Sequence, residues 1–468
     1  MKNEQVFTPI DIVRKILEDI DYRGDRIRKK HIIDNSCGDG AFLCEIVYVY
    51  IKDCIITSTK KEETIKELET YIHGIEKDKN LYEKCVENLN KICEEFSLGE
   101  VKWDIMNADT LTVTKYDGMM DFVVGNPPYC RVHDLGEQYD KVKQYKFCES
   151  GMTDLYLVFF EIGIRMMNEH GILGYITPNS WLTSKAGNNF RQYLLENRVL
   201  HEIYQYGHKK VFKEANTYCC LTFITKKGDS LTTFFYGEDG CDKYHIYDLK
   251  HCMIDDNIYL TRGEILDKLS DISKVSKDKE KKRISVKNGF ATLNDNLFKI
   301  DEYVLTRTEI NMNNILKTIK ASNCNEHCFF YPYDENGKPT RHIDNALMSY
   351  MEDKAVRLNV DIKNPNWMFY GRTQALNDVK YDKLVVNNLV RKTDDIKISF
   401  KKGPYGVYSG YYIPLTDEDI SYDKLYYIIK SQEFIDYVKA IGKYKNGGYY
   451  SFSSKDLERF VNWKLDTV

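Results

Sequence analysis

The segment His31-Ile-Ile-Asp34-Asn-Ser-Cys-Gly38-Asp-Gly40 decides the fold class. Its apolar run ending at Asp34 predicts a short buried strand, its two glycines predict a tight turn, and the residues from Ala41 to Ile51 predict a helix. Alternating strands and helices continue along the first half of the chain, which indicates an α/β fold with a doubly wound, mostly parallel sheet and helices on both faces. Further strands are expected at residues 71–76, 101–105, 121–124 and 172–176, and further helices at 10–20, 77–96 and 155–168.

The composition is that of a globular protein with more than one domain. The chain has 468 residues, 43% hydrophobic and 29% charged, and this length favours two or three domains. A net charge of -4 argues against a sequence-indifferent DNA coat, which would be basic overall, but it allows a local basic cleft. No apolar run is long enough to span a membrane, and the 13 scattered cysteines are typical of reduced thiols. We therefore expect a cytoplasmic protein with no membrane partner.

The character of the chain changes after its first half. The run Lys277-Asp-Lys-Glu-Lys-Lys-Arg283 contains no apolar residue, and short strands and turn signals follow it. We expect an α/β domain over residues 1–250, a helical and charged linker over 251–284, and a mixed α/β domain over 285–468.

Polar residues follow three of the predicted strands, at the edge where parallel sheets bind ligands. Gly38 and Gly40 allow a ligand to approach the backbone at the start of a helix. The turn lacks the third glycine of the dinucleotide fingerprint, which argues against NAD. Glu76 is placed to accept hydrogen bonds from a ribose, and Asp109 from an adenine amino group. Each acid alone is better explained as a strand end or a helix cap, but together the three strand ends predict an adenosine-shaped pocket.

The segment Asp121-Phe-Val-Val-Gly-Asn126-Pro127-Pro128-Tyr129 carries the strongest chemical signal. Two prolines remove two backbone donors and fix φ, so the turn is rigid and its carbonyl groups point outward. The side-chain oxygen of Asn126 and the carbonyl of Pro127 can then accept two hydrogen bonds from a planar amine, while Tyr129 stacks on its ring. An ordinary surface turn is the alternative interpretation.

Together these segments resemble the gamma-class, TaqI-like N6-adenine DNA methyltransferases of restriction–modification systems. The resemblance implies a Rossmann-like, class I S-adenosylmethionine-dependent fold, with S-adenosyl-L-methionine as cofactor and a flipped-out adenine in double-stranded DNA as substrate. It also implies that residues 1–250 are catalytic and that 285–468 recognise the DNA target. Under this resemblance the catalytic residues are Asn126, Pro127, Pro128, Tyr129 and Phe212, with Tyr129 and Phe212 on either side of the base. The cofactor-binding residues are Phe7, Thr8, Pro9, Asp34, Ser36, Cys37, Gly38, Gly40, Glu76, Asp109, Asn126 and Phe159.

The sequence departs from the family pattern at two positions, Asn35 and Asp39, which flank the glycine turn. The spacing from Asp34 to Glu76 is also long for one strand–helix–strand unit, and we predict that residues 60–69 form an inserted helix. Neither departure removes a predicted ligand of the cofactor.

Several alternatives remain open. The amine could be cytosine N4, an RNA base or a protein glutamine, or the chain could be a non-catalytic DNA-binding relative. A zinc site at Cys324 and Cys328 lacks a matching second pair, so no metal is expected. The resemblance implies that the protein is located in the bacterial cytoplasm, associated with the nucleoid. It leaves open whether a separately encoded restriction endonuclease is a partner. The sequence does not decide between monomer and dimer.

Overall fold

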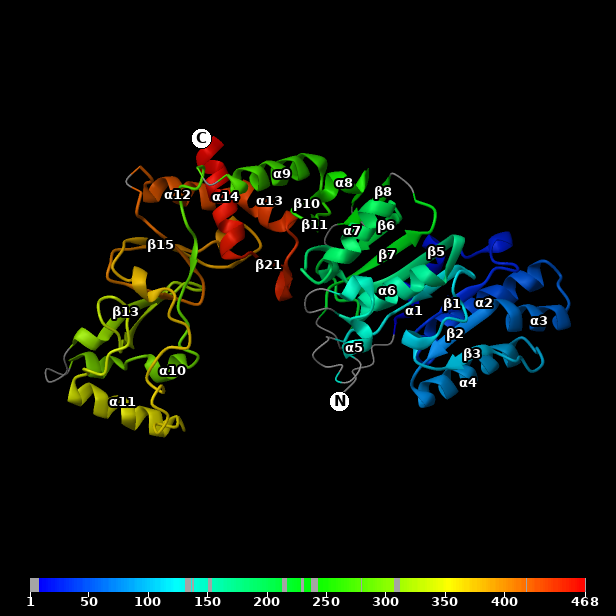
Figure 1. Cartoon of the computed structure of the whole chain (residues 1–468), viewed down its shortest axis with the longest axis horizontal. Coiled ribbons are helices and arrows are strands. Elements are labelled where there is room, and N and C mark those ends of the chain that lie inside the picture. The colour runs from blue at the N-terminus through cyan, green and yellow to red at the C-terminus, as the bar shows by residue number, and fades with distance from the viewer. Residues whose placement is uncertain are drawn as a thin grey trace. The chain divides into compact units, whose positions relative to one another are not determined.

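The computed structural model describes residues 8–130, 136, 139–149, 154–212, 217–228, 231–236, 243–278, 280–306, 312–417 and 419–467. The chain forms two compact units, Met1–Arg262 and Gly263–Val468, and each is described by itself (Figure 1). No helix among the described residues is long and apolar enough to cross a membrane.

A nine-stranded sheet, counted over the described residues, organises the first unit. Its strand order is β3-β2-β1-β4-β5-β7-β6-β8-β9. The first five strands in this order pair in parallel, and β7 then runs antiparallel to both β5 and β6. The predicted doubly wound, mostly parallel sheet is therefore confirmed, with an added antiparallel edge. The strands are β1 (Ile32–Asp34), β2 (Ile72–Glu76), β3 (Asp104–Asn107), β4 (Met120–Gly125), β5 (Met167–Pro178), β6 (Leu200–Gln205), β7 (Cys219–Thr225), β8 (Thr232–Tyr236) and β9 (Lys243–Tyr247).

Helices cover both faces of this sheet, as the packing around β5 shows. Small residues allow the close approach: a Cβ on Gly174 of β5 would meet Ile16 of α1, and a Cβ on Gly163 of α6 would meet Tyr175 of β5. Successive residues of a strand point to opposite faces, so α1 and α6 lie on opposite sides of the sheet (Figure 1). The helices of this unit are α1 (Ile10–Asp19), α2 (Ala41–Ile56), α3 (Lys61–Tyr71), α4 (Lys79–Glu95), α5 (Tyr139–Val142), α6 (Leu155–Met166), α7 (Asn188–Asn197) and α8 (Leu249–Cys252).

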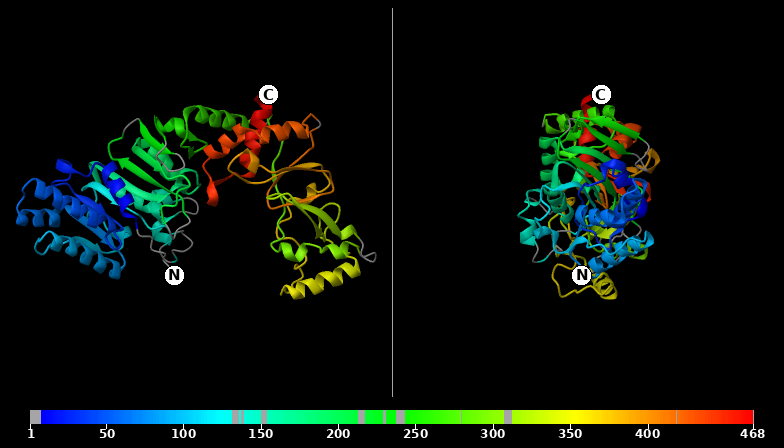
Figure 2. Two further views of the ribbon diagram at one scale, coloured as in Figure 1. Left: turned by 180° about the vertical axis from the view of Figure 1, so that it is seen from behind. Right: turned by 90° about the vertical axis from the view of Figure 1, so that its right-hand side faces the viewer.

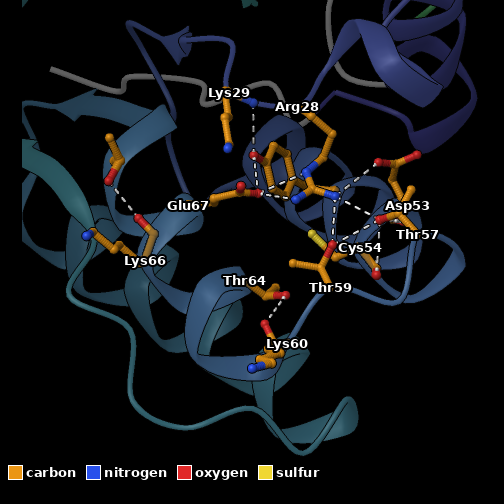
Figure 3. Close-up of polar contacts among 12 residues, drawn as sticks. Arg28, Lys29, Asp53, Cys54, Thr57, Thr59, Lys60, Thr64, Lys66 and Glu67 are labelled. Carbon is orange, nitrogen blue, oxygen red and sulfur yellow. Dashed lines mark hydrogen bonds and ion pairs between the residues drawn. The ribbon is translucent and has the colours of Figure 1, made fainter.

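The inserted helix predicted at residues 60–69 is α3. An ion-pair cluster joins it to the turn before β1 (Figure 3). The Arg28 guanidinium lies 2.8 Å from the Glu67 carboxylate and donates to the hydroxyls of Thr57 (2.8 Å) and Thr59 (2.9 Å), while the Tyr50 hydroxyl donates to Glu67 (3.0 Å). Glu67 is buried. The cluster therefore holds α2, α3 and the turn before β1 together.

The second unit has a mixed α/β architecture, as expected. A four-stranded sheet joins β12 (Lys287–Asn288), β19 (Tyr411–Pro414), β15 (Lys383–Val386) and β17 (Ile398–Lys401) in that order. A three-stranded sheet joins β14 (Asn325–Phe330), β13 (Ile315–Lys320) and β18 (Gly406–Tyr408), and another joins β16 (Leu389–Val390), β21 (Tyr449–Ser451) and β20 (Tyr444–Lys445).

Its helices are α9 (Gly263–Lys277), α10 (Asp295–Phe298), α11 (Asn345–Arg357), α12 (Tyr422–Ile429), α13 (Gln432–Ala440) and α14 (Ser454–Thr467). Leu347 and Met351 of α11 pack in one core with Ile319 of β13 and Phe329 of β14, and the helix lies beside this sheet in both views (Figures 1 and 2).

The segment expected to link the domains, residues 251–284, is largely structured. It contains a short hairpin of β10 (Met253–Ile254) and β11 (Asn257–Ile258), and then α9. Helix α9 belongs to the second unit, where it packs against α14. The division of labour expected for residues 1–250 and 285–468 remains a prediction.

Candidate functional site

The glycine turn after β1 closes tightly and opens α2. Gly38 and Gly40 have φ values of +55° and +95°, and the amide of Gly40 donates to the carbonyl of Cys37 (2.8 Å). A Cβ on Gly40 would lie 2.9 Å from the Cys85 sulfur of α4, so glycine is required both for the backbone conformation and for the packing. The turn leaves its backbone at the start of a helix, where a ligand can approach it closely.

Asp34 ends β1 and is 1% exposed. Its Oδ1 atom accepts a hydrogen bond from the Ser36 amide (3.0 Å). Gly125, at the end of β4, has a φ of +152°, and a Cβ there would come within 2.8 Å of Asp34 Oδ1. Burial raises the pKa of Asp34 to about 7, with a smaller contribution from the Glu76 charge, although the hydrogen bond from Ser36 opposes the shift. A buried carboxyl of this kind suits a cationic ligand, which would favour its charged form.

Glu76 ends β2, and its carboxylate faces the glycine turn. One oxygen accepts from the Gly38 amide (2.9 Å) and the other from the Asp78 amide (2.7 Å). A carboxylate offers about four acceptor positions, so these two bonds leave capacity for ligand hydroxyls. Glu76 therefore both stabilises the turn and stands beside it, as its predicted role in holding a ribose requires.

Asp109 follows β3 and is engaged in two interactions. Its carboxylate forms an ion pair with Lys77 (2.9 Å) and accepts from the Leu111 amide (3.2 Å). A contact with an adenine amino group would have to share this carboxylate with Lys77. Lys77 was not among the predicted site residues, although it directly follows Glu76.

The Asn126-Pro127-Pro128-Tyr129 turn follows β4, next to Asp34. The Tyr129 hydroxyl donates to Asn126 Oδ1 (2.6 Å) and approaches the carbonyl of Ile176 on β5 (3.3 Å). Burial raises the pKa of Tyr129 well above its usual 10, so this hydroxyl remains a donor. The hydroxyl of Ser36 approaches the Asn126 carbonyl (3.4 Å), which joins this turn to the glycine turn.

Phe212 was predicted to face Tyr129 across a flipped base. Its ring lies 6.3 Å from that of Tyr129 at an interplanar angle of 65°, and Phe212 is 2% exposed. The two rings thus meet edge to face in a packed core and do not flank an open slot. Residues 213–216, which follow Phe212, lie outside the described residues. Its role against the base remains a prediction.

The other predicted cofactor residues lie on three different segments. Pro9 precedes α1 as its N-cap, and Thr8 is partly buried beside it, whereas Phe7 lies outside the described residues. Phe159 is buried on α6. Cys37 is also buried, and its hydrogen bond with Cys85 together with burial raises the pKa of its thiol. Its role in cofactor binding remains a prediction.

Two further residues support the site without having been predicted as ligands. Asn35 is fully buried; its Oδ1 accepts from the Tyr175 hydroxyl (2.9 Å) and its carbonyl from the Thr110 hydroxyl (2.7 Å). Tyr175 lies on β5, and the sequence gives no sign that its hydroxyl reaches Asn35, directly after β1. Among the described residues there is no group of three or more His, Cys, Asp or Glu side chains that could hold a metal ion.

Residues 42–212 match the family model described as Eco57I restriction-modification methylase. These residues form a methylase domain of that type. They contain Glu76, Asp109 and the turn at Asn126–Tyr129, and the predicted resemblance to restriction–modification methyltransferases is thereby confirmed.

Relatives of this methylase domain occur in proteins longer than this chain. The type II restriction enzyme and methyltransferase RM.Eco57I of Escherichia coli is 24% identical over 82% of this chain and 49% of its own length. The type II methyltransferase M.BstVI of Geobacillus stearothermophilus is 28% identical over 47% of this chain and 42% of its own length. The chain thus spans about half the length, or less, of these curated relatives.

A solved structure shows that the fold extends beyond the methylase domain. The type IIL restriction-modification enzyme MmeI, in complex with DNA, superposes with a TM-score of 0.64 at 14% sequence identity. The match covers 95% of this chain and 65% of the MmeI chain. Both units of the present protein therefore have counterparts in that fold.

Proposed function

We propose that this protein is an S-adenosyl-L-methionine-dependent DNA methyltransferase that modifies the N6 atom of adenine. The observation that carries the proposal is the meeting of the glycine turn, Asp34 and the Asn126–Tyr129 turn at one edge of the sheet. The methylase domain match and the restriction–modification relatives support the same activity.

The residues at this edge fit the cofactor. Gly38 in the left-handed glycine turn leaves open space where a Cβ would stand, and Glu76 stands beside it to accept hydroxyl groups. The buried carboxyl of Asp34 suits a ligand that carries positive charge. When bound, S-adenosyl-L-methionine supplies a methyl group on a cationic sulfur.

The Asn126 turn would position the amine. Adenine N6 is a weak nucleophile because its lone pair is delocalised into the ring. Asn126 Oδ1 and the Pro127 carbonyl would accept its two hydrogens and favour a pyramidal nitrogen, whose lone pair then points at the methyl carbon. An amide oxygen can accept two hydrogen bonds, so Asn126 can keep its bond from Tyr129 while it holds the amine.

The transfer needs no covalent enzyme intermediate. The methyl group that S-adenosyl-L-methionine supplies would pass directly to the amine held by Asn126 and Pro127, and the amine would release one proton to solvent. The contribution of the protein is orientation and stabilisation of charge that develops in the transition state. The target adenine must leave the helix stack to reach this edge.

The amine-holding role of Asn126 is tested by Asn126→Ala in the full chain. We expect turnover on DNA to fall at least about 100-fold, the scale of losing one transition-state hydrogen bond, while calorimetric affinity for the cofactor changes little. Asn197→Ala on the surface of α7 is the matched control. Wild-type turnover in Asn126→Ala would contradict the mechanism.

A further inference from the structure

The second unit contains a wide polar cleft that the methylase chemistry does not use. Its volume is about 950 Å³. It is lined by residues 288–296 and 408–411, together with Ser322, Arg372, Gln374 and Asn388. Binding pockets for small cofactors are mostly apolar and enclose their ligand, so this cleft suits a large polar partner.

Several side chains that line the cleft can each make two hydrogen bonds to one partner. Asn288, Asn296 and Gln374 are exposed amides. Arg372 is also exposed, and its guanidinium has no carboxylate partner among the described residues. Amides pair in a bidentate manner with adenine edges and guanidinium groups with guanine edges.

The charges in the cleft favour base edges over phosphates. The described lining contains one arginine and no lysine, and its one carboxylate, Asp295, accepts from the Thr292 hydroxyl (2.5 Å). A surface that bound only the phosphate backbone of DNA would carry several lysines and arginines.

Leu293 projects from the rim of this cleft in an unusual conformation. It has a φ of +66° and is 81% exposed, so it has an unfavourable backbone and buries little apolar surface. Hydrogen bonds fix the turn around it: the Asn294 amide donates to Thr292 Oγ1 (3.2 Å), and the Leu297 amide donates to Asn294 Oδ1 (3.2 Å).

The neighbouring glycine also accommodates this side chain. A Cβ on Gly371 would collide with the Leu293 side chain, so glycine at that position leaves room for the leucine. An exposed leucine held rigidly among amides contributes little to folding, and it is suited to apolar contact with a partner.

We propose that this cleft reads base edges of the target duplex, with Arg372 and Gln374 as hydrogen-bonding readers and Leu293 as the apolar contact with the bases. The proposal rests on the proposed function and adds the residues that determine its sequence specificity. The glutamine amide and the guanidinium set the hydrogen-bonding positions, while the leucine meets a thymine methyl group or a base face.

The test begins with the full chain and the sequence that it methylates, defined by single-molecule sequencing of plasmid DNA modified by the wild type. Methylation rates are then measured on a duplex oligonucleotide carrying that sequence and on duplexes with each base pair changed in turn. The variants are Arg372→Ala, Gln374→Ala and Leu293→Asn. Arg341→Ala and Leu358→Asn, outside the cleft lining, are the controls.

We expect Arg372→Ala and Gln374→Ala each to lower kcat/KM on the target about 5- to 150-fold, and to relax discrimination at one base pair. Leu293→Asn should lower kcat/KM on the target while its Tm stays equal or rises, because asparagine tolerates a left-handed backbone. A lower kcat/KM without a lower Tm would indicate that Leu293 contacts DNA, since loss of a structural role would lower the Tm as well. The controls should stay within about twofold of the wild type.

Unchanged rates and unchanged discrimination in all three cleft variants would overturn this assignment while the proposed function stood. Equal losses on every duplex, without relaxed discrimination, would also overturn base reading. If the wild type methylated no DNA at all, the proposed function would fail, and the role of the cleft would fail with it.

Discussion

Asp34 makes the stability of the first unit depend on pH. Its pKa is about 7 in the folded protein, against an ordinary value of 3.8. Because the folded-state pKa is raised, the contribution of this carboxyl to stability is fully present below about pH 4 and is lost as the pH rises to about 7.

Asp34→Asn should therefore stabilise the protein at pH 8, since the amide keeps an acceptor for the Ser36 amide and carries no charge to bury. Each pKa unit corresponds to about 1.4 kcal/mol, which makes the expected gain a few kcal/mol at pH 8 and little near pH 4. Urea unfolding at both pH values measures it, with Asp25→Asn as an exposed control. An equal effect of Asp34→Asn at both pH values would contradict the assigned pKa.

The residues at the site were partly predictable from the sequence. Strand-end position brought Asp34 and Glu76 together as candidates, because parallel strands bring their carboxyl ends to one edge, and the two prolines after Asn126 identified that residue. The hydrogen bond from Gly38 to Glu76 and the ion pair of Lys77 with Asp109 were not predicted. They depend on side-chain directions in three dimensions, which spacing along a chain does not give.

Among the secondary-structure elements, α3 is expected to depend on the Arg28 cluster for much of the stability of its packing against α2 and the turn before β1. Removing the guanidinium leaves the buried carboxylates of Glu67 and Asp53 without the cation that lies between them (Figure 3). Breaking one side of a buried pair costs about 3–5 kcal/mol, and we expect a loss of this order for Arg28→Ala.

A double-mutant cycle with Glu67→Ala checks this expectation, because the double variant should lose less than the sum of the single ones. Arg14→Ala, which removes an exposed partner of Glu45, provides the contrast and should change stability little. Additive losses in the Arg28 cycle would show that the pair is not coupled.

Elements near the glycine turn were predicted well because their signals are local. Helices α1, α2, α4 and α6 and strands β1, β2 and β4 lie close to their predicted ranges. Strand β3 begins three residues later than expected, since its ladder with β2 starts at the pair His73–Asp104. The strands from β6 to β9 were not predicted. They pair out of chain order, β5 with β7 and β6 with β8, and spacing along the sequence does not give this order.

At the scale of the whole molecule, the unit boundary at Arg262 predicts how the chain can be divided. A fragment of residues 1–262 should bind the cofactor about as tightly as the full chain, but it should not methylate a specific sequence. A fragment ending at residue 282 should be less soluble, because Leu266, Leu269 and Ile272 of α9 are buried and would lose α14. Calorimetry and methylation assays on both fragments measure this. Sequence-specific methylation by residues 1–262 would contradict the proposed role of the second unit.

The central claim concerns the atom that receives the methyl group. Purified full-length protein is incubated with isotopically labelled S-adenosyl-L-methionine and unmethylated plasmid DNA, and the nucleosides are separated and identified by mass spectrometry. We expect the label in N6-methyl-2′-deoxyadenosine. The Asn126→Ala variant should give no label in this nucleoside. Label in N4-methylcytosine, or label only in protein or RNA added to the same reaction, would contradict the account.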